Sequence, residues 1–246
     1  YKCSLERVCL KRWLTSIRLR QTPFFSLAEH SLNTPNLLHM KIFGLNPSQV
    51  LERLGTEKIK SPYSLTFSIL YGGIGFGLVS VIAYSIWAFR LIRGQWTMYA
   101  SIALVYLLLS GWVLSRLTIV PKNQIRFTAL FSVAFLGYAV LWCLFWLGLK
   151  WHHHGDLYGS ALGLLLMAII LKRAFGSQGN LLFVFGILFT FHTLGYYAGD
   201  DLHQITGGST GRLLWGACHG IGFGAGLGCL IHQCQLPLIE ASESTN

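Results

Sequence analysis

The sequence predicts an all-α protein of the polytopic membrane class: a transmembrane helix bundle of six spans that pack through glycine-rich faces. Hydrophobic residues make up 53% of the 246 residues. Charged residues make up only 11%, far below the roughly 25% of soluble domains. Six stretches lack Asp, Glu, Lys and Arg altogether, and several of them carry glycines four residues apart. This composition excludes an ordinary soluble domain and a disordered chain.

The six uncharged stretches define the predicted spans. They run over residues 61–89, 94–115, 127–149, 157–171, 174–199 and 213–239. A helix needs about 20 residues to cross the hydrocarbon core, and all stretches but the fourth reach that length. The fourth covers only about 22 Å at 1.5 Å per residue, so its flanks must dip inward, with Lys172 and Arg173 extending outward on their long stems. We therefore predict a six-helix transmembrane domain over 61–233 and a short polar tail over 234–246.

The first sixty residues form a separate, basic region that holds 10 of the 19 Lys and Arg residues. We interpret it as a solvated tail, with attraction to an anionic membrane surface as the alternative. No nucleic-acid-binding motif accompanies the charge, so nucleic acid is not an expected partner. Met40 offers a start for the native chain, which would make residues 1–39 non-native. A short helix is expected over 47–54, because Asn46 and Pro47 favour a helix start and Gly55 an end.

The orientation follows from the basic residues near the span ends. With the N-terminus inside, seven Lys and Arg lie on the inner face: Lys58, Lys60, Arg116, Lys122, Arg126, Lys172 and Arg173. Four lie on the outer face: Arg90, Arg93, Lys150 and Arg212. An even number of spans returns the chain to the same side. We predict a multi-pass protein of the cell membrane with both termini in the cytoplasm.

The sixth span carries the clearest glycine pattern. One row is four residues apart (Gly216, Gly220, Gly224 and Gly228), and Gly222 with Gly226 forms a second row. Glycines at this spacing share a helix face and allow another backbone to approach closely. The pattern predicts close packing within the bundle and is also compatible with an oligomer that associates through such faces.

The acidic residues of the membrane domain gather in two links that the predicted orientation places outside. Asp156 lies in the link before the fourth span, beside His152, His153 and His154. Asp200, Asp201 and His203 lie in the link between the fifth and sixth spans. Imidazole and carboxylate together are typical of divalent-metal sites and of proton relays. For the three consecutive histidines, a solvated loop is the simpler interpretation.

Two further histidines lie within spans. His192 is eight residues before Asp200, and His219 is seven residues after Arg212, so they lie about 12 and 10 Å below the outer ends of spans five and six. Each shares its helix face with glycines, which indicates a packed rather than a lipid-facing position. Polar residues inside a span are costly and usually functional. The alternative is a pair of interhelical hydrogen bonds that only holds the bundle together.

These residues predict an outward-facing polar pocket among spans four to six. His192 and His219 would line it, and Asp156, Asp200, Asp201 and His203 would form its mouth. We expect it to bind or translocate a small solute, a proton or a metal ion. The alternatives are a structural subunit without chemistry, a membrane-embedded metal-dependent hydrolase, and a haem protein with iron between the two histidines. A divalent metal is the more plausible cofactor and haem the less plausible one; the sequence does not decide whether the protein is an enzyme.

Overall fold

The computed structural model describes residues 43–55, 59–149 and 154–243, with side chains up to residue 240. Throughout these ranges the regular structure is helical, with no strand. Six helices are long and apolar enough to cross a membrane, and each overlaps one of the six uncharged stretches. The prediction of an all-α, six-span bundle is therefore confirmed, and the protein is an integral membrane protein.

The bounds of the helices are as follows. Five spans are single helices: α3 (Leu65–Ala88), α6 (Gln124–Gly148), α7 (Gly155–Phe175), α8 (Leu181–Thr206) and α9 (Gly208–Glu243). The second span is composite and consists of α4 (Gln95–Val105), the π-helical turn η2 (Tyr106–Ser110), α5 (Gly111–Leu114) and the 3₁₀ turn η3 (Ser115–Leu117). The short helix α2 (Pro47–Leu54) precedes the bundle.

Local sequence explains several helix ends. The Ser64 hydroxyl accepts a bond from the Phe67 amide at 3.2 Å and starts α3. The Asn180 side chain accepts from the Leu182 amide at 2.9 Å and starts α8. Such caps satisfy amides that a helix start leaves without intrahelical partners. At its other end, α7 stops at Gly176, whose φ of 67° is readily adopted only by glycine.

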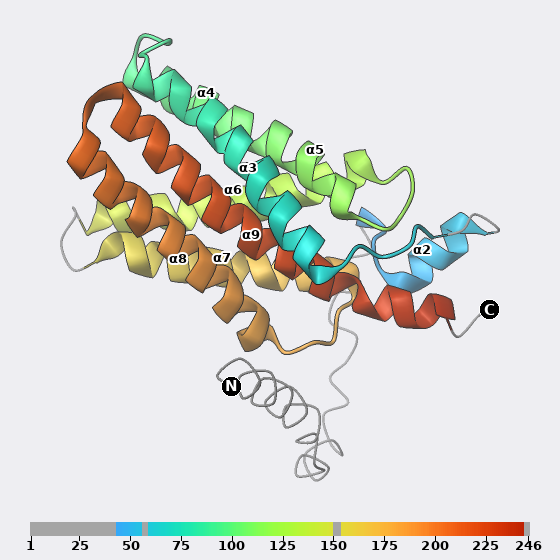
Figure 1. Ribbon diagram of the computed structural model, residues 1–246. Coiled ribbons are helices and arrows are strands. Elements are labelled where there is room, and N and C mark those ends of the chain that lie inside the picture. The colour runs from blue at the N-terminus through green and yellow to red at the C-terminus, as the bar shows by residue number, and fades with distance from the viewer. Residues whose placement is uncertain (1–42, 56–58, 150–153, 244–246) are drawn as a thin grey trace, which may run out of the picture. The chain divides into compact units, whose positions relative to one another are not determined.

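Helix α9 lies between α3 and α8 (Figure 1) and makes its most extensive contacts with these two helices. Its first glycine row faces α3: a Cβ atom on Gly220 would lie 2.9 Å from the Cα of Gly77. Its second row faces α8: a Cβ atom on Gly222 would lie 2.9 Å from the Cα of Gly195. The predicted glycine packing is thus found within one chain. An oligomer through such faces stays a prediction that a single chain does not test.

The bundle has two ends, which we name by their links. At the α8–α9 end, Gly207 joins α8 to α9, and the link 89–94, the last residues of α6 and the first residues of α7 lie at the same end because successive spans alternate in direction (Figure 1). The opposite end carries α2 and the links 118–123 and 176–180. Between them, a buried aromatic core includes Phe76, Phe131 and Phe223.

Three boundaries differ from the sequence-based expectation. The fourth span has 21 residues and includes Lys172; its side chain is buried and donates to the Gly179 carbonyl instead of extending outward. The predicted link between the fifth and sixth spans is almost wholly helical, with Gly207 alone between α8 and α9. Residues 234–243, which we assigned to a polar tail, continue α9. This last part of α9 packs against the link that follows the second span, where the Gln235 side chain accepts a hydrogen bond from the Ile119 amide at 2.8 Å.

Candidate functional site

His192 and His219 lie on α8 and α9, two helices that approach each other closely through glycine. His192 belongs to α8 and is three residues before Gly195; His219 belongs to α9 and is three residues before Gly222. Because Gly195 and Gly222 lack side chains, the two backbones come together at this level. The same feature that packs the helices thus brings the two imidazoles to one depth.

The two imidazoles are in direct contact. The Nε2 atoms of His192 and His219 are 3.2 Å apart, and the ring centroids are 4.9 Å apart with the rings nearly perpendicular, at 89°. His192 is 1% exposed, so water does not solvate its ring from the surface. A contact between two Nε2 atoms requires that one carries a proton and the other a lone pair. In the neutral pair one Nε2 would donate to the other, and the tautomers of the two rings determine which one donates.

Tyr138 of α6 adds a third polar group. Its hydroxyl lies 2.8 Å from Nε2 of His192, and it is itself buried. One nitrogen of His192 is consequently approached by both a phenol and a second imidazole. Such a short, water-excluded network responds strongly to a change in proton number, because its hydrogen bonds act in a medium of low dielectric constant.

Aromatic rings enclose the network. The Phe223 ring packs against His192 at 4.9 Å and against Tyr138 at 5.2 Å between centroids. On the other side, Tyr196 lies 5.7 Å from the His219 ring. Towards the opposite end of the bundle, the path from Phe223 continues into the buried rings of Phe76 and Phe135. This apolar layer separates the network from the opposite end of the bundle.

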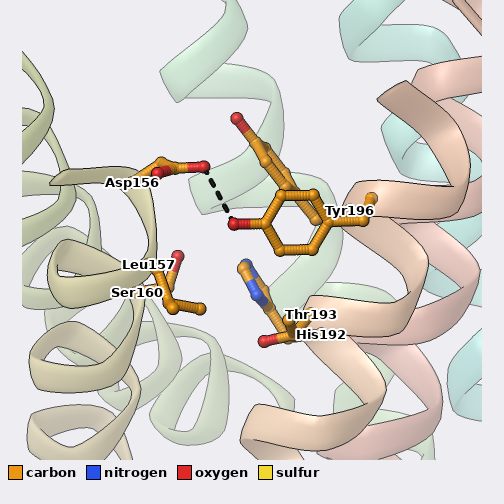
Figure 2. Close-up of a pocket in the computed structure, with 7 residues that line it drawn as sticks. Asp156, Leu157, Ser160, His192, Thr193 and Tyr196 are labelled. Carbon is orange, nitrogen blue, oxygen red and sulfur yellow. Dashed lines mark hydrogen bonds between the residues drawn. The ribbon is translucent and has the colours of Figure 1, made fainter. Parts of the chain in front are cut away.

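A small pocket lies beside His192, towards the α8–α9 end (Figure 2). Its lining comes from α7 and α8 and consists of Asp156, Leu157, Ser160, His192, Thr193, Tyr196 and Tyr197. Figure 2 shows Asp156 and Ser160 on one helix facing His192 on the other, and its dashed line marks the bond from the Tyr197 hydroxyl to Asp156 Oδ2, which is 3.3 Å long. About 10 Å³ is open to the centre of a water-sized sphere, which is room for about one water molecule.

Several buried polar atoms beside this pocket have no hydrogen-bond partner in the described part of the chain. They are Nδ1 of His192, Nδ1 of His219 and Oγ1 of Thr193. A buried polar atom left without a partner costs about 1–3 kcal/mol, and ordered water commonly supplies the missing bond. The two Nδ1 atoms are the outer nitrogens of the imidazole pair, so each is placed to take up or release a proton.

The structure brings together only part of the predicted site. Asp156 lines the pocket, in the first turn of α7. Asp200 instead accepts from Gln204 at 2.8 Å on α8, and Asp201 is exposed. His203 stacks on Trp215 at 5.4 Å, away from the pocket lining. His154 is exposed just before α7, whereas His152 and His153 lie outside the described residues.

The geometry bears on the two cofactors considered. Within the described ranges, no group of three or more His, Cys, Asp and Glu side chains is arranged to hold a metal ion, whereas protein zinc sites use three or four such ligands. The pocket beside the pair holds about one water, and a porphyrin ring does not fit between imidazoles whose Nε2 atoms are 3.2 Å apart. The residues therefore do not fit haem in this conformation.

Sequence reasoning missed most of the groups around the pair. Tyr138, Ser160, Thr193 and Tyr196 contribute hydroxyls from α6, α7 and α8. A hydroxyl inside an apolar span is a signal, but hydroxyls are common in such spans and often bond to their own helix, as Ser85 does to the Ile82 carbonyl at 2.6 Å. Only the rotation of each helix about its axis selects the ones that face His192.

These features define the class of the protein: a six-span integral membrane protein in which a buried and a half-buried imidazole form a pair beneath a narrow polar pocket. No family model matches the sequence, and comparison with curated proteins and with solved structures finds no match either. Function is therefore argued from the site.

Proposed function

We propose that this membrane protein binds and relays a proton at the His192–His219 pair, and that the proton enters through the pocket at the α8–α9 end. The observation that carries the proposal is the 3.2 Å contact between the two Nε2 atoms. The pocket is too small for a solute larger than about one water. Within the described residues no group of three or more His, Cys, Asp and Glu side chains could hold a metal ion, which leaves the proton among the predicted ligands.

The relay follows from the two nitrogens of each imidazole. A proton taken up at Nδ1 of His192 releases the shared proton from Nε2 of His192 to Nε2 of His219, and the Nδ1 proton of His219 then leaves. One net proton moves and no bond other than N–H changes. Histidine suits this role because each imidazole has two nitrogens that can hold a proton, and Asp156 at the mouth provides a carboxylate that attracts the incoming proton. Passage beyond the aromatic layer would need a conformational change.

The test is a pH titration of the full chain in lipid, with the imidazole nitrogens followed by ¹⁵N NMR. We expect the signals of His192 and His219 to shift together in one step, and the step to change in His192→Gln and His219→Gln. His232→Gln is the matched control, because His232 lies on α9 outside the pair and its removal should leave the step in place. Two independent titrations of the two imidazoles would contradict the proposal.

Proton movement across the membrane is a second readout. In proteoliposomes that contain a pH-sensitive dye, flux that is lost in His192→Gln but kept in His232→Gln would indicate translocation. Uptake at the pair without flux would indicate a one-sided proton site. Metal analysis of the same preparations distinguishes a proton site from a metal site. A stoichiometric metal that is lost in both His192→Gln and His219→Gln would favour the metal site.

A further inference from the structure

The outer surface between α3 and the second span is hollowed into an apolar groove of about 670 Å³. Its lining comes from α3, η2 and α5 and comprises Phe67, Leu70, Tyr71, Ile74, Gly75, Leu78, Val79, Ile82, Leu109, Trp112 and Val113. Several of these are among the most exposed apolar side chains of the protein, with Ile74 at 62% and Leu78 at 63%. The groove lies within two membrane spans, so its surroundings are lipid chains.

The groove exists because the second span packs loosely. None of the residues of α4 is buried, and the helix then changes to a π-helical turn over Tyr106–Ser110. A π-turn rotates the residues that follow it relative to an α-helix. At the floor, the absence of a side chain at Gly75 lets Val113 approach, since a Cβ atom there would lie 2.6 Å from Val113 Cγ1. From Phe67 to Ile82 the groove is about 22 Å long at 1.5 Å per residue, longer than one leaflet's half of a hydrocarbon core of about 30 Å.

One end of the groove is positively charged. The Arg116 guanidinium lies 4.9 Å from the ring centroid of Trp112, a lining residue. Arg116 is exposed, and no carboxylate pairs with it within the described residues. Lys60, also exposed, reaches the same end, since its amide donates to the Ile119 carbonyl at 3.0 Å. A guanidinium held on an aromatic face keeps most of its N–H donors available for a phosphate.

Aromatic rings at this end fit the position of a lipid headgroup. Tyr63 stacks on Phe67 at 4.8 Å, and Phe67 stacks on Tyr71 at 5.8 Å. Rows of this kind are typical of the interface between the hydrocarbon core and water. The end with Arg116 therefore lies where a phosphate would be, and the apolar part runs towards the membrane centre.

We infer that the groove is a binding site for an anionic phospholipid, with one acyl chain along α3 and the phosphate on Arg116. A second copy of the chain is the competing occupant. A symmetric dimer through this face would bring two Arg116 side chains and two Lys60 side chains together at one membrane surface, which like charges oppose. An anionic lipid complements the same charges. The inference does not involve the histidine pair.

The test is native mass spectrometry of the full chain with added phosphatidylglycerol and, separately, phosphatidylcholine. We expect one phosphatidylglycerol to be retained in preference to phosphatidylcholine. Arg116→Gln should reduce that preference about tenfold, because a charge-assisted bond is lost. Arg93→Gln is the control: Arg93 is exposed at the α8–α9 end, away from the groove. Equal retention by wild type and Arg116→Gln would overturn the inference.

A second pair of variants tests the apolar part. Ile74→Trp fills the groove from a lining position, whereas Leu144→Trp adds the same bulk on α6 at a similarly exposed site, 61% against 62%. We expect Ile74→Trp to lose the retained lipid and Leu144→Trp to keep it. A dimer in wild type that retains no lipid and that Ile74→Trp dissociates would assign the groove to a second copy and reject the lipid. Should Ile74→Trp not fold, the Arg116→Gln comparison decides alone.

Discussion

His192 and His219 are 27 residues apart in the chain, yet their Nε2 atoms lie within 3.2 Å. The helix turn at Gly207 folds α9 back along α8, and the contact of Gly195 with Gly222 sets the distance between the two backbones. A buried contact of two imidazoles has no stable arrangement in which both Nε2 atoms carry a proton. The hydrogen bond between the two rings therefore depends on how many protons they carry, and this dependence is the physical basis of the proposed relay.

Replacing Tyr138 with Phe tests the third member of the network. The change removes a hydroxyl 2.8 Å from His192 Nε2 and leaves the ring in place. We expect a loss of about 1 kcal/mol in the free energy of unfolding, the net worth of one buried hydrogen bond, and a shifted proton uptake by the pair. Thermal unfolding in detergent and the ¹⁵N titration measure these effects. Tyr158→Phe, at a 54% exposed position on α7, should change neither.

The glycine packing makes a second prediction. A Cβ atom on Gly224 would lie 2.6 Å from Phe76 Cβ and would also meet the Gly72 carbonyl. Gly224→Ala should therefore destabilise the protein by about 1–3 kcal/mol, the usual cost of overpacking. Gly186→Ala on α8 is the matched control, since nothing lies within 4 Å of its added Cβ and alanine favours a helix. Equal unfolding temperatures for the two variants would refute tight packing at Gly224.

Gln235 makes a third prediction, because it joins the end of the second span to α9. Its side chain accepts from the Ile119 amide at 2.8 Å and donates to the Leu117 carbonyl at 3.2 Å. Gln235→Leu leaves both backbone groups without these bonds and should cost about 1–3 kcal/mol for each buried group. Gln204→Leu alters an exposed glutamine on α8 and should have little effect. Unfolding in denaturant measures the free energy of unfolding of both variants. Equal values would mean that water replaces the hydrogen bonds of Gln235.

The orientation remains a prediction and has a direct test. The excess of basic residues at the end opposite the α8–α9 link predicts that this end is cytoplasmic. A fluorescent protein fused after Asn246 should then fold and fluoresce, whereas alkaline phosphatase fused at the same point should stay inactive. The reverse result would place the pocket on the cytoplasmic side, without changing the geometry of the pair.

Arg53, at the end of the bundle opposite the α8–α9 end, shows how burial and a neighbouring charge affect a basic side chain outside the spans. Arg53, at the end of α2, donates to the Gly44 carbonyl at 3.3 Å. Partial burial, and then repulsion by Arg126, lower the pKa of the Arg53 guanidinium from its ordinary value. Arginine is still charged at neutral pH, so the two cations add to the positive charge of this end.

The six spans, the glycine rows and the common depth of His192 and His219 could all be predicted from residue order, because each depends on composition or on the 1.5 Å rise of a single helix. Depth is one coordinate of a side chain. The rotation of α6 and α7 about their axes is another, and it depends on packing between helices distant in sequence. That rotation adds Tyr138 and Ser160 to the site. Likewise, only the packing of α9 shows that residues after 233 continue the helix, since Gln235 finds its partners in the link after the second span.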